Sequence, residues 1–341
     1  MSLSSKTPSG RASVKIPAFL ALALALLAVL VFSLGVGAVP LTPIQVLAAL
    51  TGEPTKASHS AIVWDFRLAR VLLVCVCGGA LGAAGAGFQG LFRNPLADPY
   101  IVGASGGAAL GATLSVVFAG ESGFGVPIGV AGFVGALAAV FIVYTLAETS
   151  GYGSVAALLL AGAAFSTMLS AIVSLLLLIN DRALQEVFAW LLGGFGGRSW
   201  PQLWQALLIA PIGIVALWAM ARPLDALATG EDGAQALGLN LRWARFVIIA
   251  GASLATAAAV AAGGLIGFVG LIAPHLARPL FGAGHARLIP ASMLLGALLL
   301  LLADGLARTL LAPIELPVGV FTALLGGPFF LILLRQRGRL A

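Results

Sequence analysis

Charged residues are scarce in this sequence, and lysine is absent from most of it. Only 9% of the 341 residues are charged and 60% are hydrophobic, whereas soluble domains carry charge on about 25% of their residues. The last of the three lysines is Lys56. A phosphate-binding loop of the form G-x-x-x-x-G-K-[ST] requires a lysine, so the body of the chain cannot contain one. We therefore expect that this chain does not hydrolyse nucleotides by itself.

Histidine and cysteine are also rare, which limits the chemistry that the chain can support. The three histidines are too far apart for the H-E-x-x-H pattern of zinc proteases. Cys75 and Cys77 are the only cysteines, and two residues apart on a helix they point to different faces. We interpret them as small apolar residues rather than as a disulfide or a metal pair. We predict no catalytic residue, no metal site and no cofactor.

Long charge-free runs dominate what is present. A helix needs about 20 apolar residues to cross a bilayer, and nine runs of at least 16 residues contain no charge: 16–52, 71–92, 99–120, 122–147, 149–180, 199–221, 246–277, 288–303 and 316–334. The run 246–277 is too long for one helix, and Gly263-Gly264 offers a place to break it in two. The sequence therefore predicts an all-α polytopic membrane protein with about ten transmembrane helices.

The flanking charges predict the topology. Basic residues favour the cytoplasmic side of a membrane, and they gather before the first run and after the last one: Lys6, Arg11, Lys15, Arg335, Arg337 and Arg339. We predict a cytoplasmic tail at 1–15, one transmembrane domain at 16–334 and a basic cytoplasmic tail at 335–341. Loop charge then explains the net charge of +6 better than nucleic-acid binding does.

The N-terminal run has a second interpretation. Val36-Gly37-Ala38 resembles the cleavage site of a secretory signal peptide. The apolar stretch before it exceeds the 7–15 residues of a typical signal core. We therefore favour a first membrane span that is retained.

Two neighbouring runs, 71–92 and 99–120, carry regularly spaced small residues. The turn 94–99 between them contains two prolines, which favour the end of a helix. Small residues recur at every fourth position on both sides of it: Gly78, Gly82, Ala86, Gly90, Gly103, Gly107 and Gly111. Such a stripe lets helix backbones approach closely in lipid. We expect both helices to pack tightly.

Several local patterns predict further features. Residues 42–50 favour a short surface helix, and the segment 180–200 includes an apolar patch suited to a helix at the membrane interface. Pro274 and Pro279 should interrupt the helix near them. Asp304 lies inside an apolar run, where an isolated carboxylate costs about 2.5–3.5 kcal/mol. Arg308, four residues on, is the expected ion-pair partner.

Two segments have more than one interpretation. The fifth run carries Ser166, Ser170 and Ser174 on one helical stripe, which is consistent with helix packing through hydroxyl residues or with a water-accessible pathway. The polar segment 223–242 contains few apolar residues. It could form a short amphipathic helix that binds a partner, or a solvated loop.

Taken together, the motifs resemble one family. They include R-L-A-R at 67–70, Q-G-L-F-R-N-P-L-A-D-P-Y at 89–100, I-G-F-V-G-L at 266–271, A-D-G-L-A-R at 303–308 and E-L-P-V-G-V at 315–320. In this order and over 62–337, they resemble the permease subunits of ABC importers for iron chelates such as ferric siderophores, haem and cobalamin. The resemblance implies a ten-helix permease that forms a homodimer, binds two copies of a cytoplasmic ATP-binding subunit and receives a periplasmic or surface substrate-binding protein.

The resemblance also implies roles for particular residues. Arg67, Arg70 and Arg308 match the arginines that receive acidic residues of the binding protein, with Ala69 in place of the family's proline, so that the second span could extend outward. Gly233, Ala234, Leu237 and Gly238 match the coupling helix that contacts the ATPase. The serine stripe matches a helix that lines the pathway.

The sequence therefore predicts a permease in the inner (plasma) membrane that imports an iron chelate, either a ferric siderophore or haem, with cobalamin as the alternative cargo. An ion-coupled secondary transporter is the rival from another class. It would need carboxylates at mid-membrane, and only Asp304 approaches that description.

Overall fold

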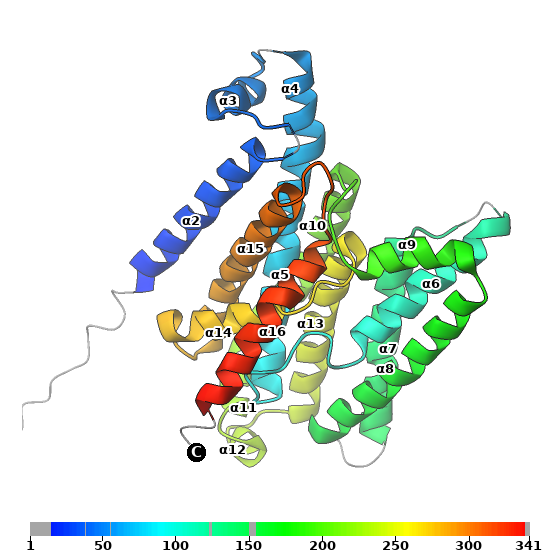
Figure 1. The fold of residues 1–341 in the computed structure, drawn as a ribbon. Helices are drawn as coiled ribbons and strands as arrows, with labels where there is room; N and C mark the ends of the chain where they lie inside the picture. The colour runs from blue at the N-terminus through cyan, green and yellow to red at the C-terminus, as the bar shows by residue number, and fades with distance from the viewer. Residues whose placement is uncertain (1–14, 38, 55, 123–124, 150–154, 338–341) are drawn as a thin grey trace, which may run out of the picture.

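The computed structural model describes residues 15–37, 39–54, 56–122, 125–149 and 155–337 (Figure 1). All regular secondary structure in these ranges is helical, which confirms the all-α prediction for them. The first half contains α2 (Lys15–Gly35), α3 (Pro43–Thr51), α4 (Ala57–Ala61), the π-helix η1 (Ile62–Leu68), α5 (Ala69–Leu91), α6 (Ala104–Ser122), α7 (Ile128–Thr149) and α8 (Val155–Leu178). The second half contains α9 (Asp181–Leu191), α10 (Trp200–Ala219), α11 (Ala221–Leu227), α12 (Glu231–Ala236), α13 (Leu241–Gly263), α14 (Val269–Phe281), α15 (His285–Thr309) and α16 (Val318–Arg337).

Among the described residues, seven helices are long and apolar enough to cross a membrane. They are α2, the continuous helix 57–91, α7, α8, α10, α13 and α15. Shorter apolar helices occur within α6 and α16, and α14 has 13 residues. The chain is thus a multi-pass membrane protein, whereas ten crossings and cytoplasmic termini stay predictions.

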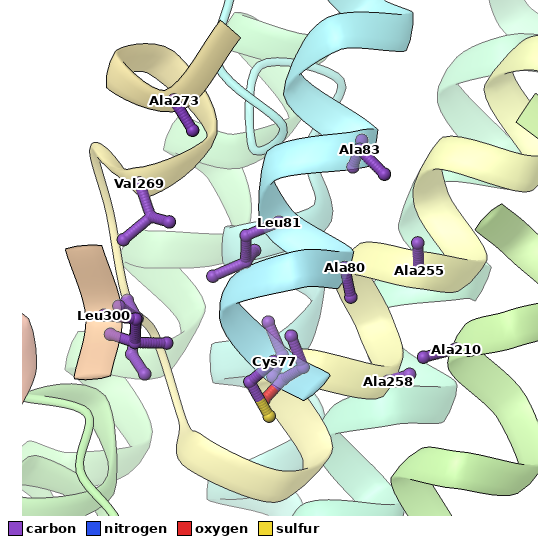
Figure 2. Close-up of a cluster of buried hydrophobic side chains, with 14 of the residues drawn as sticks. Cys77, Ala80, Leu81, Ala83, Ala210, Ala255, Ala258, Val269, Ala273 and Leu300 are labelled. Atoms are coloured by element: carbon purple, nitrogen blue, oxygen red, sulfur yellow. The ribbon is translucent and has the colours of Figure 1, made fainter. Parts of the chain in front are cut away.

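Helix α5 is the centre of the bundle. It packs against α15, α13, α10 and α14 (Figure 1). Figure 2 shows Leu81 on the side of α5 that faces Val269 of α14 and Leu300 of α15, while Ala80 faces α13. The helix runs from 57 to 91 without a break at Ala69, so the extension of this helix is confirmed, whereas its outward direction stays a prediction.

The small residues of the two stripes lie where helices approach most closely. A methyl group on Gly82 would overlap the carbonyl oxygen of Ser292 in α15. Gly107 and Gly111 of α6 lie against the backbone of α7 at Gly135 and Ala131. Each stripe thus meets a different neighbour, α15 for α5 and α7 for α6.

Replacing Gly85 with alanine should destabilise the protein, because the new methyl group would overlap the carbonyl oxygen of Gly270 in α14. Overpacking of this kind costs about 1–3 kcal/mol. Gly79→Ala is the matched control on the same helix, since its nearest neighbour would be the Met293 carbonyl oxygen at 3.6 Å. Denaturant unfolding in detergent micelles should show a lower midpoint for Gly85→Ala alone. Equal midpoints for the two variants would contradict the close packing.

The break predicted inside 246–277 is confirmed. α13 ends at Gly263, Gly264 has a φ of 73° and α14 begins at Val269. The turn 92–103 holds this connection, because the Tyr100 hydroxyl donates to the carbonyl of Ile266 and accepts from its N–H, both at 3.3 Å. The Asp98 carboxylate accepts the N–H groups of Tyr100 and Phe268. Burial raises the pKa of the Asp98 carboxyl to about 6, although both donors favour its ionised form.

The predicted interruption at Pro274 and Pro279 is wrong, because α14 continues through both residues. Pro274 has no N–H, so the carbonyl of Gly270 loses its helical partner. Gln89 of α5 compensates, since its side-chain amide donates to the carbonyls of Gly270 (3.4 Å) and Leu271 (3.2 Å). A neighbouring side chain that binds the freed carbonyl lets a membrane helix tolerate proline.

The two surface helices are present. α3 has a capping box, in which Thr42 accepts the N–H of Gln45 and the Gln45 side chain accepts the N–H of Thr42. α9 occupies 181–191 within the segment predicted to lie at the interface.

Candidate functional site

Four charged residues gather where α5 begins and α15 ends. We call Arg70, Asp304, Arg308 and Glu315 the outer charge cluster, after the side of the membrane on which the predicted topology places them. Arg70 lies 2.9 Å from Asp304 and 2.8 Å from Glu315, and Arg308 lies 3.0 Å from Asp304. The Asp304 side chain is fully buried, whereas that of Glu315 is 46% exposed. The predicted pair between Asp304 and Arg308 is confirmed, and Arg70 joins it.

Two arginines also bind the end of α2. Arg67 donates to the carbonyl oxygens of Leu34 (2.8 Å) and Val39, and Arg308 donates to those of Val36 (3.1 Å) and Ser33 (3.4 Å). The last carbonyls of a helix lack intrahelical partners and carry partial negative charge. These contacts therefore fasten α2 to α15 and η1.

All three arginines of the predicted docking set are buried: Arg67, Arg70 and Arg308 are 7%, 8% and 4% exposed. The structure brings Arg70 and Arg308 together on one carboxylate and gives Arg67 backbone partners. Sequence reasoning missed Glu315, although its position directly before the last span placed it at the same end as Arg70. Arg70 already binds Asp304 and Glu315, so an acidic group of a partner would compete with these two carboxylates for it.

The segment 223–242 lies at the opposite end of the bundle (Figure 1). It forms two short helices, α11 and α12, rather than the one helix of the first interpretation, because Gly230 takes a φ of 102° between them. Asp225 of α11 accepts the backbone N–H of His285 (2.9 Å) and contacts its Nδ1 (2.6 Å). Glu231 of α12 lies 2.7 Å from Arg245 of α13. These contacts thus attach α11 to α15 and α12 to α13.

The four residues of the predicted coupling set differ in exposure. Ala234 is fully buried, and a methyl group on Gly233 would lie 2.6 Å from the Thr229 hydroxyl oxygen. Leu237 is 71% exposed, and Gly238, with a φ of 80°, is open to the surroundings. Ala234 therefore anchors α12, and Leu237 and Gly238 form its accessible side.

The predicted pathway serines lie on α8. Ser170 and Ser174 are exposed, and the Ser174 hydroxyl donates to the carbonyl of Ser170 at 2.9 Å. Ser166 is half-buried, and Gly103 and Gly106 at the start of α6 lie against it. Gly103 of the packing stripe has a φ of 93° and lies just before α6.

Comparison with known proteins assigns this arrangement to a family. The chain is 42% identical to the cobalamin import system permease protein BtuC of Halobacterium salinarum, over 84% of this chain and 76% of the relative. It is 45% identical to the hemin transport system permease protein HmuU of Yersinia pestis, over 81% and 84%. A solved structure described as "An inward-facing conformation of a putative metal-chelate type ABC transporter" aligns with a TM-score of 0.82 and 32% identity, covering 94% of this chain and 99% of that one. The family model of the FecCD transport family matches residues 25–336, and the chain therefore belongs to this family as an ABC-transporter permease.

Proposed function

We propose that this permease imports an iron chelate, a ferric siderophore or haem, through the inner (plasma) membrane with energy from ATP hydrolysed by a separate subunit. The family match over 25–336 carries the proposal. The 45% identity to a hemin permease supports haem. Cobalamin is the second candidate cargo, because the relative from Halobacterium salinarum is named for it.

The assembly that we propose is a homodimer with two copies of a cytoplasmic ATP-binding subunit. Ten membrane crossings would place both termini on the same side, and the basic residues at both ends favour the cytoplasm for the termini and for the segment 223–242. Leu237 and Gly238 would contact the ATPase, and Ser170 and Ser174 would face the pathway between the protomers. The exposure of all four residues in the protomer supports these roles.

A substrate-binding protein would dock at the opposite end, over the outer charge cluster. For Arg67, Arg70 and Arg308, docking then requires rearrangement, since all three are buried and internally bonded. A carboxylate of the carrier would replace Glu315 on Arg70. Exposed charge pairs contribute only about 0.2–1 kcal/mol each, which suits orientation rather than tight capture.

Carrier-stimulated ATP hydrolysis tests the function. The permease is co-purified with its ATP-binding subunit, placed in nanodiscs and mixed with binding proteins loaded with haem, a ferric siderophore or cobalamin. We expect one loaded carrier to stimulate hydrolysis severalfold and the permease without the ATP-binding subunit to hydrolyse nothing. Cargo accumulation by vesicles that contain the permease alone would overturn the proposal in favour of ion-coupled transport.

A further inference from the structure

A cavity of about 490 Å³, with four charged residues in its lining, lies beside the outer charge cluster. We call it the α9 cavity. Its lining comes from α9, the glycine-rich connection to α10, the end of α13 and the connection between α15 and α16. The charged residues that line it are Arg70, Glu186, Arg198 and Glu315. All of these elements meet at the end of the bundle away from α11 and α12 (Figure 1).

Two side chains of this lining have buried donors without acceptors. The Nε1 of Trp190 and the Nε of Arg198 have no hydrogen-bond partner among the described residues. Trp190 is 6% exposed. Burial also lowers the pKa of the Arg198 guanidinium, because no carboxylate offsets the loss of solvent. A buried donor left unpaired costs about 1–3 kcal/mol, and both of these donors belong to side chains that line the same cavity.

The carboxylates of the cavity do not supply an acceptor for these donors. Glu315 binds Arg70 at 2.8 Å, and Glu186 lies exposed on α9. Neither carboxylate lies within 4.0 Å of the Arg198 guanidinium. Among the described residues, Arg198 therefore has no internal counter-ion, whereas Arg67 binds backbone carbonyls and Arg70 and Arg308 share Asp304.

We propose that the α9 cavity binds a carboxylate side chain of the substrate-binding protein, with Arg198 and Trp190 as the donors. The inference rests on the proposed function. Arginine suits a carboxylate because its planar guanidinium can donate two parallel hydrogen bonds. The approach is open, since Gly196 and Gly197 are exposed and a methyl group on Gly197 would meet nothing within 4 Å. A carrier carboxylate can enter here without displacing any internal ion pair.

The test measures binding of the carrier that stimulates ATP hydrolysis to the complete importer in nanodiscs. Arg198→Gln should weaken binding about tenfold, the loss expected for one charge-assisted hydrogen bond, and should flatten its salt dependence. Arg198→Lys should reduce the affinity for the carrier less than Arg198→Gln does, because lysine keeps the positive charge. Trp190→Phe should weaken carrier binding severalfold. Glu186→Gln is the matched control in the same cavity. This change removes a negative charge that would repel the carrier carboxylate, so the affinity for the carrier should stay the same or increase.

Several outcomes would overturn the proposal. Arg198→Gln with unchanged affinity and salt dependence would exclude the carboxylate site while carrier-stimulated hydrolysis, and with it the proposed function, still held. If Arg198→Gln left the carrier affinity unchanged but raised the KM for cargo, the group that accepts from Arg198 would belong to the cargo and not to the carrier. Equal losses of carrier affinity in Arg198→Lys and Arg198→Gln would indicate that Arg198 acts through packing and not through its charge. If no loaded carrier bound the wild-type importer, the proposed function and this inference would fail together.

Discussion

Replacing Asp304 with asparagine is expected to lower the free energy of unfolding by about 3–5 kcal/mol, the usual cost of removing one partner from a buried ion pair. The change preserves side-chain volume but removes the carboxylate that Arg70 and Arg308 share. Arg70 would keep Glu315, whereas Arg308 would keep only the backbone carbonyls of α2. The guanidinium of Arg308 would then be a buried charge without a counter-ion.

Denaturant unfolding in detergent micelles, followed by circular dichroism, measures this effect. Asp65→Asn is the matched control, because Asp65 is exposed on η1, and its change should stay within about 0.5 kcal/mol. In the double variant Asp304→Asn with Arg308→Gln, the losses should not add, and the coupling should reach about 0.5–3 kcal/mol. Additive losses would mean that the ion pair does not stabilise the fold.

Features set by local spacing could be predicted from the sequence. The excess length of the run 246–277 and its paired glycines located the break between α13 and α14. The helix predicted at 42–50 is α3, which begins at the capping box of Thr42 and Gln45, three residues apart. Asp304 and Arg308 stand four apart, the spacing of neighbours on a helix face. In each case the deciding contact lies within one turn or one loop.

Features set by distant contacts could not be predicted. Arg70 meets Asp304 and Glu315 across 234 and 245 residues, so its burial was invisible in the R-L-A-R motif. The α14 prolines were misjudged for the same reason, because Gln89 lies 181 residues from the carbonyl that it satisfies. Arg198 also lacks any local signal, since its isolation depends on which carboxylates the fold brings near it.

The two ends of the bundle are connected by its long helices. At the α11–α12 end, Asp225 binds the backbone N–H and the Nδ1 of His285 in α15, and Glu231 binds Arg245 in α13. A displacement of α11 and α12 would therefore be transmitted to α13 and α15, which both pack against α5. Because the outer charge cluster joins α5 to α15 at the far end, the same helices connect the two regions.

Replacing Leu237 with serine should then uncouple the permease from its ATPase. Leu237 is 71% exposed, and burying a leucine side chain at an interface contributes about 1.5–3 kcal/mol. The affinity for the ATP-binding subunit should accordingly fall about 10- to 100-fold, and cargo uptake should fall with it. Stability should not change, since the side chain contributes little to the core of the protomer.

Leu184→Ser on α9 is the matched control, because Leu184 is exposed and α9 lies at the other end of the bundle (Figure 1). Normal ATPase binding by Leu237→Ser, measured by co-purification and by titration in nanodiscs, would show that the accessible side of α12 is not the coupling surface.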